Sequence, residues 1–292
     1  MPDAVPLHDS ISAADLAAVA APLQARPDRF QAYFGDDAAE ITAEIEKVPE
    51  WRTHTVVAFE GDALIGWLIA EHDAEIGRVW WWGPVVAAEH HWSTVAETLL
   101  DDAIERLDGR FEQFEFAVDG RHVDAIELAQ RRGHRRDIGS VLLELTLSDV
   151  QRPVASAVVD IAELADADAD AVARLHDALF PDSHLTGRQL VAEHDGLVLV
   201  ARLDERPLGY LRAEVQPGGD GYLDFVGVDA EHRSRGIGRA LVDHAVTELA
   251  SSGADRVSLT VREDNASARA LYARLGFDGD RILVPLRLGF GA

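Results

Sequence analysis

The sequence contains no cysteine and only one lysine in 292 residues. The absence of cysteine excludes disulfide bonds, thiolate metal sites and a cysteine nucleophile, and it leaves the redox compartment open. Basic residues are also scarce: 27 of them stand against 52 acidic residues, for a formal net charge of −25. This negative field repels nucleic-acid phosphates and anionic lipid surfaces, so we expect neither nucleic acid nor membrane as a partner.

Long apolar runs are missing as well. No stretch approaches the ~18 consecutive apolar residues of a membrane span. The N-terminus has no basic segment ahead of its apolar residues, so we predict no signal peptide and a cytoplasmic protein. Apolar residues still make up 47 % of the chain, which is enough for a packed core. The length is that of two average domains.

Three segments of the first half recur in the second half, in the same order and at an almost constant distance of 142 or 143 residues. The matching pairs are 57–68 with 200–211, 86–90 with 228–232, and 128–134 with 271–277. Such repetition indicates two copies of one domain. We predict domains at residues 1–150 and 151–292, joined where polar residues and a proline interrupt the pattern near 148–153.

The second copy has the pattern of an α/β domain with a mixed sheet. The helix expected over 238–250 carries its apolar residues on one face. Asn265 is suited to begin the short helix over 266–275, and Gly276 is suited to end it. The other expected elements are strands at 157–161, 222–228, 256–261 and 281–288, helices at 168–179 and 186–193, and a hairpin at 197–215.

The most informative segment is VDAEHRSRGIGRAL, residues 228–241, which follows a strand and opens an amphipathic helix. Gly236 and Gly238 allow a sharp turn that presents successive backbone N–H groups, and the helix N-terminus adds the positive end of its dipole. Positive charge comes from Arg233, Arg235 and Arg239. The segment therefore predicts an anion site suited to a pyrophosphate.

Arg-x-x-Gly-x-Gly after a Val-Gly-Val strand, followed by Asn265 and by LYARLGF at 271–277, resembles the GNAT superfamily of acetyl-coenzyme A-dependent N-acetyltransferases. The resemblance covers nearly all of residues 157–288. A dinucleotide-binding fold is disfavoured because the loop follows a late strand and lacks Gly-x-Gly-x-x-Gly. A P-loop is excluded because no Gly-Lys-Ser/Thr follows. The resemblance implies two tandem GNAT-like domains and acetyl-CoA as co-substrate.

The resemblance also implies roles for individual residues. Val226 and Val228, on either side of Gly227, present backbone groups to the pantetheine arm, which Asn265 also contacts. Tyr272 stands near the thioester sulfur as the general acid. The pyrophosphate is held by Arg233, Ser234, Arg235, Gly236, Ile237, Gly238 and Arg239. Helix capping alone also accounts for Asn265, and core packing alone for Tyr272.

A carboxylate on the preceding strand is the candidate base. Asp224 lies two residues after Tyr222 and two before Val226, so strand alternation places the three side chains on one face. The resemblance assigns such a carboxylate to deprotonation of the acceptor amine, directly or through water. Glu214 on the neighbouring strand competes with Asp224, and a solvated surface carboxylate is the alternative for each.

The first copy lacks these anion-binding features. At the matching positions, Thr94 and Ala96 replace the glycines, and the arginines are replaced by His91, Ser93 and Glu97. Tyr272 and Asn265 are replaced by Ala129 and His122. We therefore expect no cofactor site in this half. His90 and His91 have no third ligand at a useful spacing, so we predict no metal site.

All six tryptophans lie in this first half, three of them in the run Trp80-Trp81-Trp82. On a strand, Trp80 and Trp82 share one face. These two side chains either pack in the core or fill the vacated cofactor cleft, and Trp81 packs against a helix.

One intact and one degenerate copy in tandem is similar in layout to the actinobacterial mycothiol synthases, which acetylate the cysteinyl amine of a thiol precursor. Those enzymes carry an acidic residue where this chain has Tyr222, so that substrate does not follow. We predict an acetyl-CoA-dependent N-acetyltransferase that acts on a small primary amine by direct attack in the second domain. A non-catalytic acyl-CoA sensor or scaffold is the alternative, and a homodimer is left open.

Overall fold

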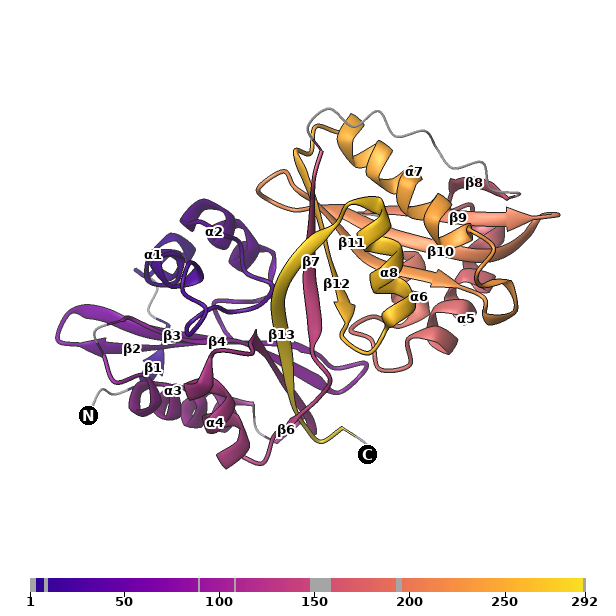
Figure 1. Ribbon diagram of the computed structural model, residues 1–292. Helices are drawn as coiled ribbons and strands as arrows, with labels where there is room; N and C mark the ends of the chain where they lie inside the picture. Colours follow the sequence, from indigo (N-terminus) through magenta and orange to yellow (C-terminus); the bar gives the residue numbers. More distant parts are fainter. Residues whose placement is uncertain are drawn as a thin grey trace. The chain divides into compact units, whose positions relative to one another are not determined.

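The computed structural model describes residues 4–7, 10–88, 90–107, 109–147, 159–192 and 196–290. Within these residues the chain forms two compact units (Figure 1). The first unit holds residues up to 141 together with 262–264 and 281–290, and the second holds 142–261 and 265–280. The expected join at 148–153 lies outside the described residues, so the boundary at residue 150 stays a prediction.

The first unit has the strand order β1-β2-β3-β4-β5-β13, with β6 paired to β13. Helices α1 and α2 cover one face of these strands, and α3 and α4 cover the other (Figure 1). Strand β4 runs parallel to β5, and their pairing extends only over residues 78–80 of β4. The bounds are β1 Ala4–Pro6, α1 Ala13–Gln24, α2 Ala38–Lys47, β2 Thr55–Glu60, β3 Ala63–Asp73, β4 Arg78–Val86, α3 Trp92–Arg106, β5 Gln113–Asp119, α4 Val123–Arg131, β6 Arg135–Arg136 and β13 Asp278–Leu288.

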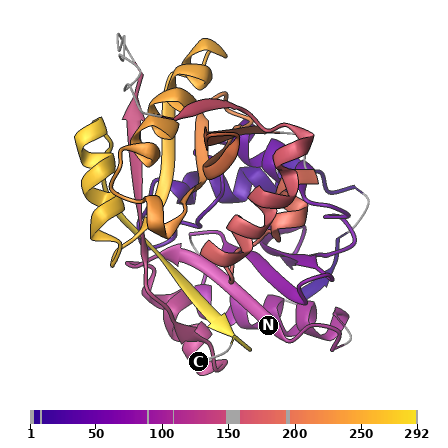
Figure 2. The ribbon, with the colours of Figure 1, turned by 90° about the vertical axis from the view of Figure 1, so that its right-hand side faces the viewer.

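The second unit has the order β7-β12-β11-β10-β9-β8. Strands β8 to β11 are antiparallel to one another, and β11 is parallel to β12. Figure 2 shows α5 and α6 on one side of the strands and α7 and α8 on the other. The bounds are β7 Ser140–Thr146, β8 Asp160–Glu163, α5 Ala169–Leu179, α6 Gly187–Ala192, β9 Leu197–Leu203, β10 Arg206–Val215, β11 Gly221–Val228, α7 Ile237–Ser251, β12 Arg256–Arg262 and α8 Ala266–Leu275.

These elements confirm the predicted α/β class with a mixed sheet. Strand β8 lies a little later than the strand expected at 157–161, of which residues 157 and 158 are outside the described part. The internal repeat is visible in the element starts: β3 and β10, β4 and β11, β5 and β12, and α4 and α8 each begin 143 residues apart. Strand β13 begins 143 residues after β6, but from residue 281 onward it belongs to the first unit.

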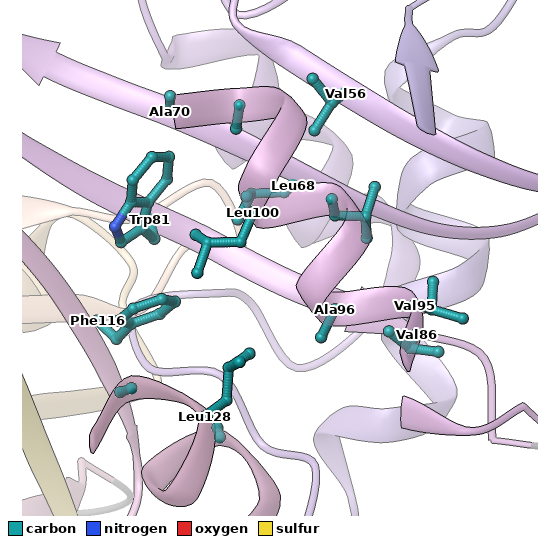
Figure 3. Packing of buried hydrophobic residues seen from close by; sticks show 14 of the residues in the cluster. Val56, Leu68, Ala70, Trp81, Val86, Val95, Ala96, Leu100, Phe116 and Leu128 are labelled. Carbon is teal, nitrogen blue, oxygen red and sulfur yellow. The ribbon is translucent and has the colours of Figure 1, made fainter. Parts of the chain in front are cut away.

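Tryptophans build the core of the first unit on both faces of its strands. Trp81 packs with Phe116 against helix α3, as predicted (Figure 3). On the opposite face, Trp82 stacks on Phe34 with ring centroids 5.1 Å apart. Its indole N–H donates to Glu71 at 2.6 Å. Core packing is therefore the role of both side chains.

Candidate functional site

Strand β11 loses register with both of its neighbours at Asp224. The consecutive residues Arg212 and Ala213 of β10 pair with Phe225 and Leu223, so Asp224 is the extra residue of a β-bulge. On the other side, the parallel pairing with β12 ends at Leu223. The strand therefore kinks at the residue where it begins to separate from β12.

The bulge changes which face each side chain occupies. A Cβ at Gly221, before the bulge, would lie 2.7 Å from a leucine of α7, whereas one at Gly227, after it, would lie 3.0 Å from a leucine of α5. Val226, next to Gly227, therefore faces the α7 side. Asp224 contacts groups on the α5 side, which Tyr222 also faces, so the prediction that Asp224 shares a face with Val226 is wrong. One extra residue reverses the alternation.

Beyond the bulge, alternate backbone groups of β11 point to the edge from which β12 has separated. The N–H of Asp229 donates to the carbonyl of Leu208 on β10 at 2.9 Å. Val226 and Val228 lie three residues and one residue before Asp229. Because backbone groups alternate along a strand, the N–H and C=O groups of these two valines point to the opposite edge, from which β12 has separated. The Val228 carbonyl accepts a hydrogen bond from Nε of Arg233 at 3.2 Å. This is the backbone orientation that the expected pantetheine contact requires.

Gly227 is explained by packing. Its missing Cβ would lie 2.7 Å from the ring of Tyr210, which is fully buried against α5. A side chain at this position would push that ring away from the core. Tyr210 therefore approaches Gly227 closely, on the face opposite to α7.

The loop before α7 turns at two residues in the left-handed region, Ser234 at φ +61° and Gly236 at φ +84°. Gly236 is the N-cap, and it provides no side-chain cap for the helix. The first hydrogen bond inside the helix is donated by Ala240 to the Gly236 carbonyl, so the preceding N–H groups are directed out of the helix end. This end of α7 fits an anion.

Gly238 takes no part in the turn, contrary to the prediction. It lies in the first turn of α7, where a Cβ would make ordinary contacts at 3.7 Å with Val228 and 3.8 Å with Leu271. The sharp turn comes from Ser234 and Gly236 instead, because only these two have a positive φ.

The three arginines of the loop differ in their surroundings. Arg233 is tied to the Val228 carbonyl, and Arg239 lies 3.4 Å from Asp243 one turn further along α7. Arg235 is exposed and makes no ion pair with any described residue. It is therefore the arginine that loses no protein partner when it pairs with an anion.

Asn265 and Tyr272 lie at the start and near the end of α8. The Oδ1 of Asn265 accepts a hydrogen bond from the N–H of Ala268 at 3.1 Å, so helix capping is realised. Tyr272 is buried, edge-on to Phe277 with centroids 5.7 Å apart. Burial raises the pKa of the Tyr272 phenol to about 12. Among the described residues the Tyr272 hydroxyl has no hydrogen-bond partner. Its proton is therefore not used in a hydrogen bond within the core.

Asp224 is held in a buried cluster of charges. Its Oδ2 lies 2.5 Å from Nη1 of Arg212 and 3.5 Å from Nε2 of His184. Burial by itself would raise the pKa of Asp224, but the charges of His184 and Arg212 outweigh it and hold that pKa below its usual range. Glu214 lies 4.0 Å from Arg212 and is more exposed.

Arg212 and His184 were missed at the level of the sequence. Arg212 lies on β10 two residues before Glu214, and a cross-strand charge pair with Asp224 is the signal that could have found it. The bulge hides this signal, because it shifts the register by one residue. His184 lies in the connection between α5 and α6, where no sequence period fixes its position.

Residues 161–277 match the family model described as "Acetyltransferase (GNAT) family". This chain contains a GNAT acetyltransferase domain. The matched residues include the bulge, the loop and α8, so the site described above lies within the GNAT domain.

Three known proteins show how far the likeness extends. The mycothiol acetyltransferase of Clavibacter michiganensis is 38% identical over 138 residues, which are 46% of this chain and 41% of that protein. The match thus spans less than half the length of that relative. A GCN5-related N-acetyltransferase from Sphaerobacter thermophilus has the same fold, with a TM-score of 0.77, 18% identity and coverage of 98% of this chain and 95% of that one. A tandem GNAT protein from the clavulanic acid biosynthesis pathway aligns over the full length of both chains, with a TM-score of 0.72 and 16% identity.

The layout is therefore that of a tandem GNAT protein, and both units are GNAT-like. In the first GNAT-like unit the anion loop has become helix. Helix α3 begins at Trp92, three residues earlier than α7 does at the repeat distance of 142. The N–H of Val95 donates to the His91 carbonyl at 3.3 Å, whereas its counterpart Ile237 lies at the open helix end. Thr94 stands where the second unit has Gly236, and α3 includes this position. Backbone N–H groups that the second unit directs outward are therefore bonded inside the helix in the first unit.

The opening between the strands of the first GNAT-like unit is also closed. Gln31 bridges to Val118 of β5, and the N–H of Ala32 donates to the Ala117 carbonyl at 3.0 Å. The Gln31 side chain donates to the carbonyl of Pro84 on β4 at 3.4 Å. The segment 30–32 thus lies between the separating strands. This segment, and not Trp80 or Trp82, therefore occupies the place that corresponds to the expected cofactor cleft.

Pro84 removes a further feature of the site. It is the counterpart of Val226 at the repeat distance of 142, and proline has no backbone N–H to offer a ligand.

No group of three or more histidine, aspartate or glutamate side chains that could hold a metal ion occurs among the described residues. The helices of the described part are all too short or too polar to span a bilayer.

Proposed function

We propose that this chain is an acetyl-CoA-dependent N-acetyltransferase whose reaction takes place in the second unit. The single observation that supports this most strongly is that strand β11 bulges and separates from β12 at Asp224, and that the same strand leads into the uncapped start of α7. Each feature alone is common. Together they place outward backbone donors at one end of the β11 edge and ionisable side chains at the other.

In the proposed site the coenzyme A pyrophosphate is bound by the start of α7 and the loop before it. Arg235 supplies a charge-assisted contact, and the outward N–H groups of α7 supply the rest. The pantetheine arm pairs with the backbone of Val226 and Val228, as an added strand would. The Nδ2 group of Asn265 donates to the same arm, since its Oδ1 is used by the cap.

The reaction we propose is direct transfer. The lone pair of a neutral primary amine forms a bond to the thioester carbonyl carbon, and a backbone N–H of β11 stabilises the developing oxyanion. The nitrogen then gives up one proton to a base, the carbon–sulfur bond breaks, and the sulfur keeps the electron pair and takes a proton from the Tyr272 hydroxyl. Solvent returns a proton to Tyr272. No acyl-enzyme on a thiol is formed, because the chain has no cysteine.

We infer that the acceptor is a small cationic or neutral amine. The net charge of −25 supports this, because a negative field attracts cations and repels polyanionic amines. The likeness to a mycothiol acetyltransferase makes a cysteinyl amine a second candidate. Against it stands Tyr222, which occupies the position where the mycothiol synthases carry an acidic residue.

Release of coenzyme A from acetyl-CoA tests this function. The assay uses chromatographic detection and a panel of amines: glucosamine, tyramine, spermidine, S-methylcysteine amide and an alanine-terminated peptide. We expect turnover with at least one small amine and little with the peptide. Tight binding of acetyl-CoA without turnover of any amine contradicts the proposal and supports the sensor alternative. Preferential turnover of S-methylcysteine amide supports the mycothiol-like alternative.

A further inference from the structure

We propose that His184 is the base that takes the proton from the acceptor amine, and that Asp224 and Arg212 hold this imidazole in position. The inference rests on the proposed acetyltransferase function and adds the base that the reaction requires.

The two ionisable groups of the cluster differ in how far they reach solvent. The His184 side chain is 47% exposed, whereas the Asp224 side chain is 9% exposed. The imidazole stacks on the Phe225 ring with centroids 5.2 Å apart and 22° between the planes. One edge of His184 therefore faces the carboxylate, and the rest of the ring lies where a substrate can approach.

Asp224 is poorly suited to be the base itself. Its carboxylate is covered by Arg212, and its low pKa makes it a weak proton acceptor at neutral pH. A buried carboxylate that contacts one imidazole nitrogen instead orients the ring and stabilises the imidazolium that forms. Because Nε2 of His184 faces Asp224, Nδ1 is the nitrogen that receives the proton.

The chain on both sides of His184 is fixed by a second histidine. Nε2–H of the buried His176 donates to the Leu185 carbonyl at 2.8 Å, which leaves Nδ1 to accept from the Tyr210 hydroxyl at 2.6 Å. Ser183 also donates to the Leu185 carbonyl. Burial lowers the pKa of His176, which keeps it neutral and this bonding pattern intact. The residues before and after His184 are thus anchored to α5 and β10.

The location of His184 agrees with this role. Its partner Asp224 is the bulge residue at which β11 separates from β12, so the imidazole lies beside the start of the opening. Asp224 on β11 contacts the imidazole, and Arg212 and Glu214 of β10 lie on the other side of that carboxylate. On α5, His176 is close enough for its charge to interact with that of His184.

The proton balance of the step is complete. The amine nitrogen gains a bond to the carbonyl carbon and loses one proton to Nδ1 of His184. The sulfur of coenzyme A leaves with the electron pair and takes the Tyr272 proton. The imidazolium then releases its proton to solvent, and Tyr272 regains one. The products are one amide and one free thiol.

The test compares His184→Ala with wild type, using the panel amine that wild type acetylates fastest. We expect kcat/KM to fall by roughly 10²-fold or more, and the acidic limb of its pH profile to disappear. Acetyl-CoA affinity, measured by calorimetry, should be unchanged. Added 4-methylimidazole should raise the turnover of His184→Ala, but not that of wild type or Tyr272→Phe. His184→Gln, which keeps a hydrogen-bonding side chain, should remain as slow as His184→Ala.

Asp224→Asn provides the second arm. It keeps the imidazole, so the acidic limb should persist but move to lower pH, because the carboxylate no longer stabilises the imidazolium. A His184→Ala protein with wild-type turnover and an unchanged acidic limb would overturn the proposal. This result differs from failure of the proposed function, in which wild type itself acetylates no amine.

Discussion

At the scale of single residues, a substitution at Tyr272 distinguishes a catalytic role of its hydroxyl from a packing role of its ring. Tyr272→Phe keeps the ring against Phe277 and removes only the hydroxyl, which has no hydrogen-bond partner among the described residues. With a pKa of about 12, the phenol stays protonated at neutral pH. We expect folding and acetyl-CoA affinity to survive and turnover to fall by roughly 10²-fold or more. An unchanged turnover number, measured where chemistry limits the rate, would assign Tyr272 to packing.

Arg235 is the residue whose charge we expect to affect acetyl-CoA affinity most directly. Arg235→Glu replaces an unpaired guanidinium with a carboxylate beside the proposed pyrophosphate, so we expect acetyl-CoA affinity to fall by about tenfold to a hundredfold. Titration calorimetry measures this change. Arg174→Glu on α5 is the matched control, since it alters the net charge equally on the other face of the sheet. Equal losses in both variants would show a general charge effect and no phosphate contact.

The sequence could predict the turn at Gly236 and the helix cap at Asn265 because their chemistry is local. Both residues act through the backbone of their own segment. The ion pair of Asp224 with Arg212 could not be predicted in this way. It depends on a bulge that shifts the register of two strands, and no periodic pattern marks that extra residue.

At the scale of elements, the two glycines at the start of α7 should respond in opposite ways to substitution by alanine. Gly236→Ala places a side chain at φ +84° and should cost about 1 kcal/mol of unfolding free energy. Gly238→Ala puts alanine into a helical turn with room for Cβ, so it should be neutral or stabilise by up to about 1 kcal/mol. Urea unfolding of the two variants measures the difference. Destabilisation by Gly238→Ala alone would contradict this account of the turn.

Helix α4 of the first unit begins at a histidine that must stay neutral. His122 caps the helix by accepting a hydrogen bond from Ala125, and burial lowers its pKa to about 4. The unfolded chain, with a histidine pKa of about 6.5, binds this proton more readily, so the first unit loses stability as the pH falls from about 6.5 to about 4. We expect a loss of about 2 kcal/mol at about pH 4.5 from this residue alone.

Tryptophan fluorescence during urea unfolding follows this effect, because all six tryptophans belong to the first unit. His122→Asn is the matched variant. It supplies the cap that Asn265 provides in α8, but it has no proton to gain, so its stability should depend less on pH. A wild-type unit that is equally stable at about pH 4.5 and about pH 7 would contradict the account.

The sequence predicted most elements of the second unit and the loss of the anion loop in the first. It could not predict how that loss is completed. Segment 30–32 closes the opening of the first unit through one bridge to Val118 and one side-chain bond to Pro84. These contacts join residues far apart in the chain, and nothing in the local pattern near Gln31 indicates them.

At the scale of the whole molecule, the repeat predicted two copies but not the assignment of their last strands. Strand β13 lies at the repeat distance from β6, yet from residue 281 it belongs to the first unit, and β7 belongs to the second from residue 142. The alternating pattern of a strand is the same whichever neighbour it joins. Pairing partners therefore had to come from the structure.

The central claim is a division of labour, in which only the second copy binds acetyl-CoA. Calorimetric titration of the full chain with acetyl-CoA tests it most directly. We predict one site per chain, weakened by Arg235→Glu and unaffected by substitutions at Gln31 in the first unit. Two equivalent sites, or a single site that survives Arg235→Glu with its affinity unchanged, would contradict the account.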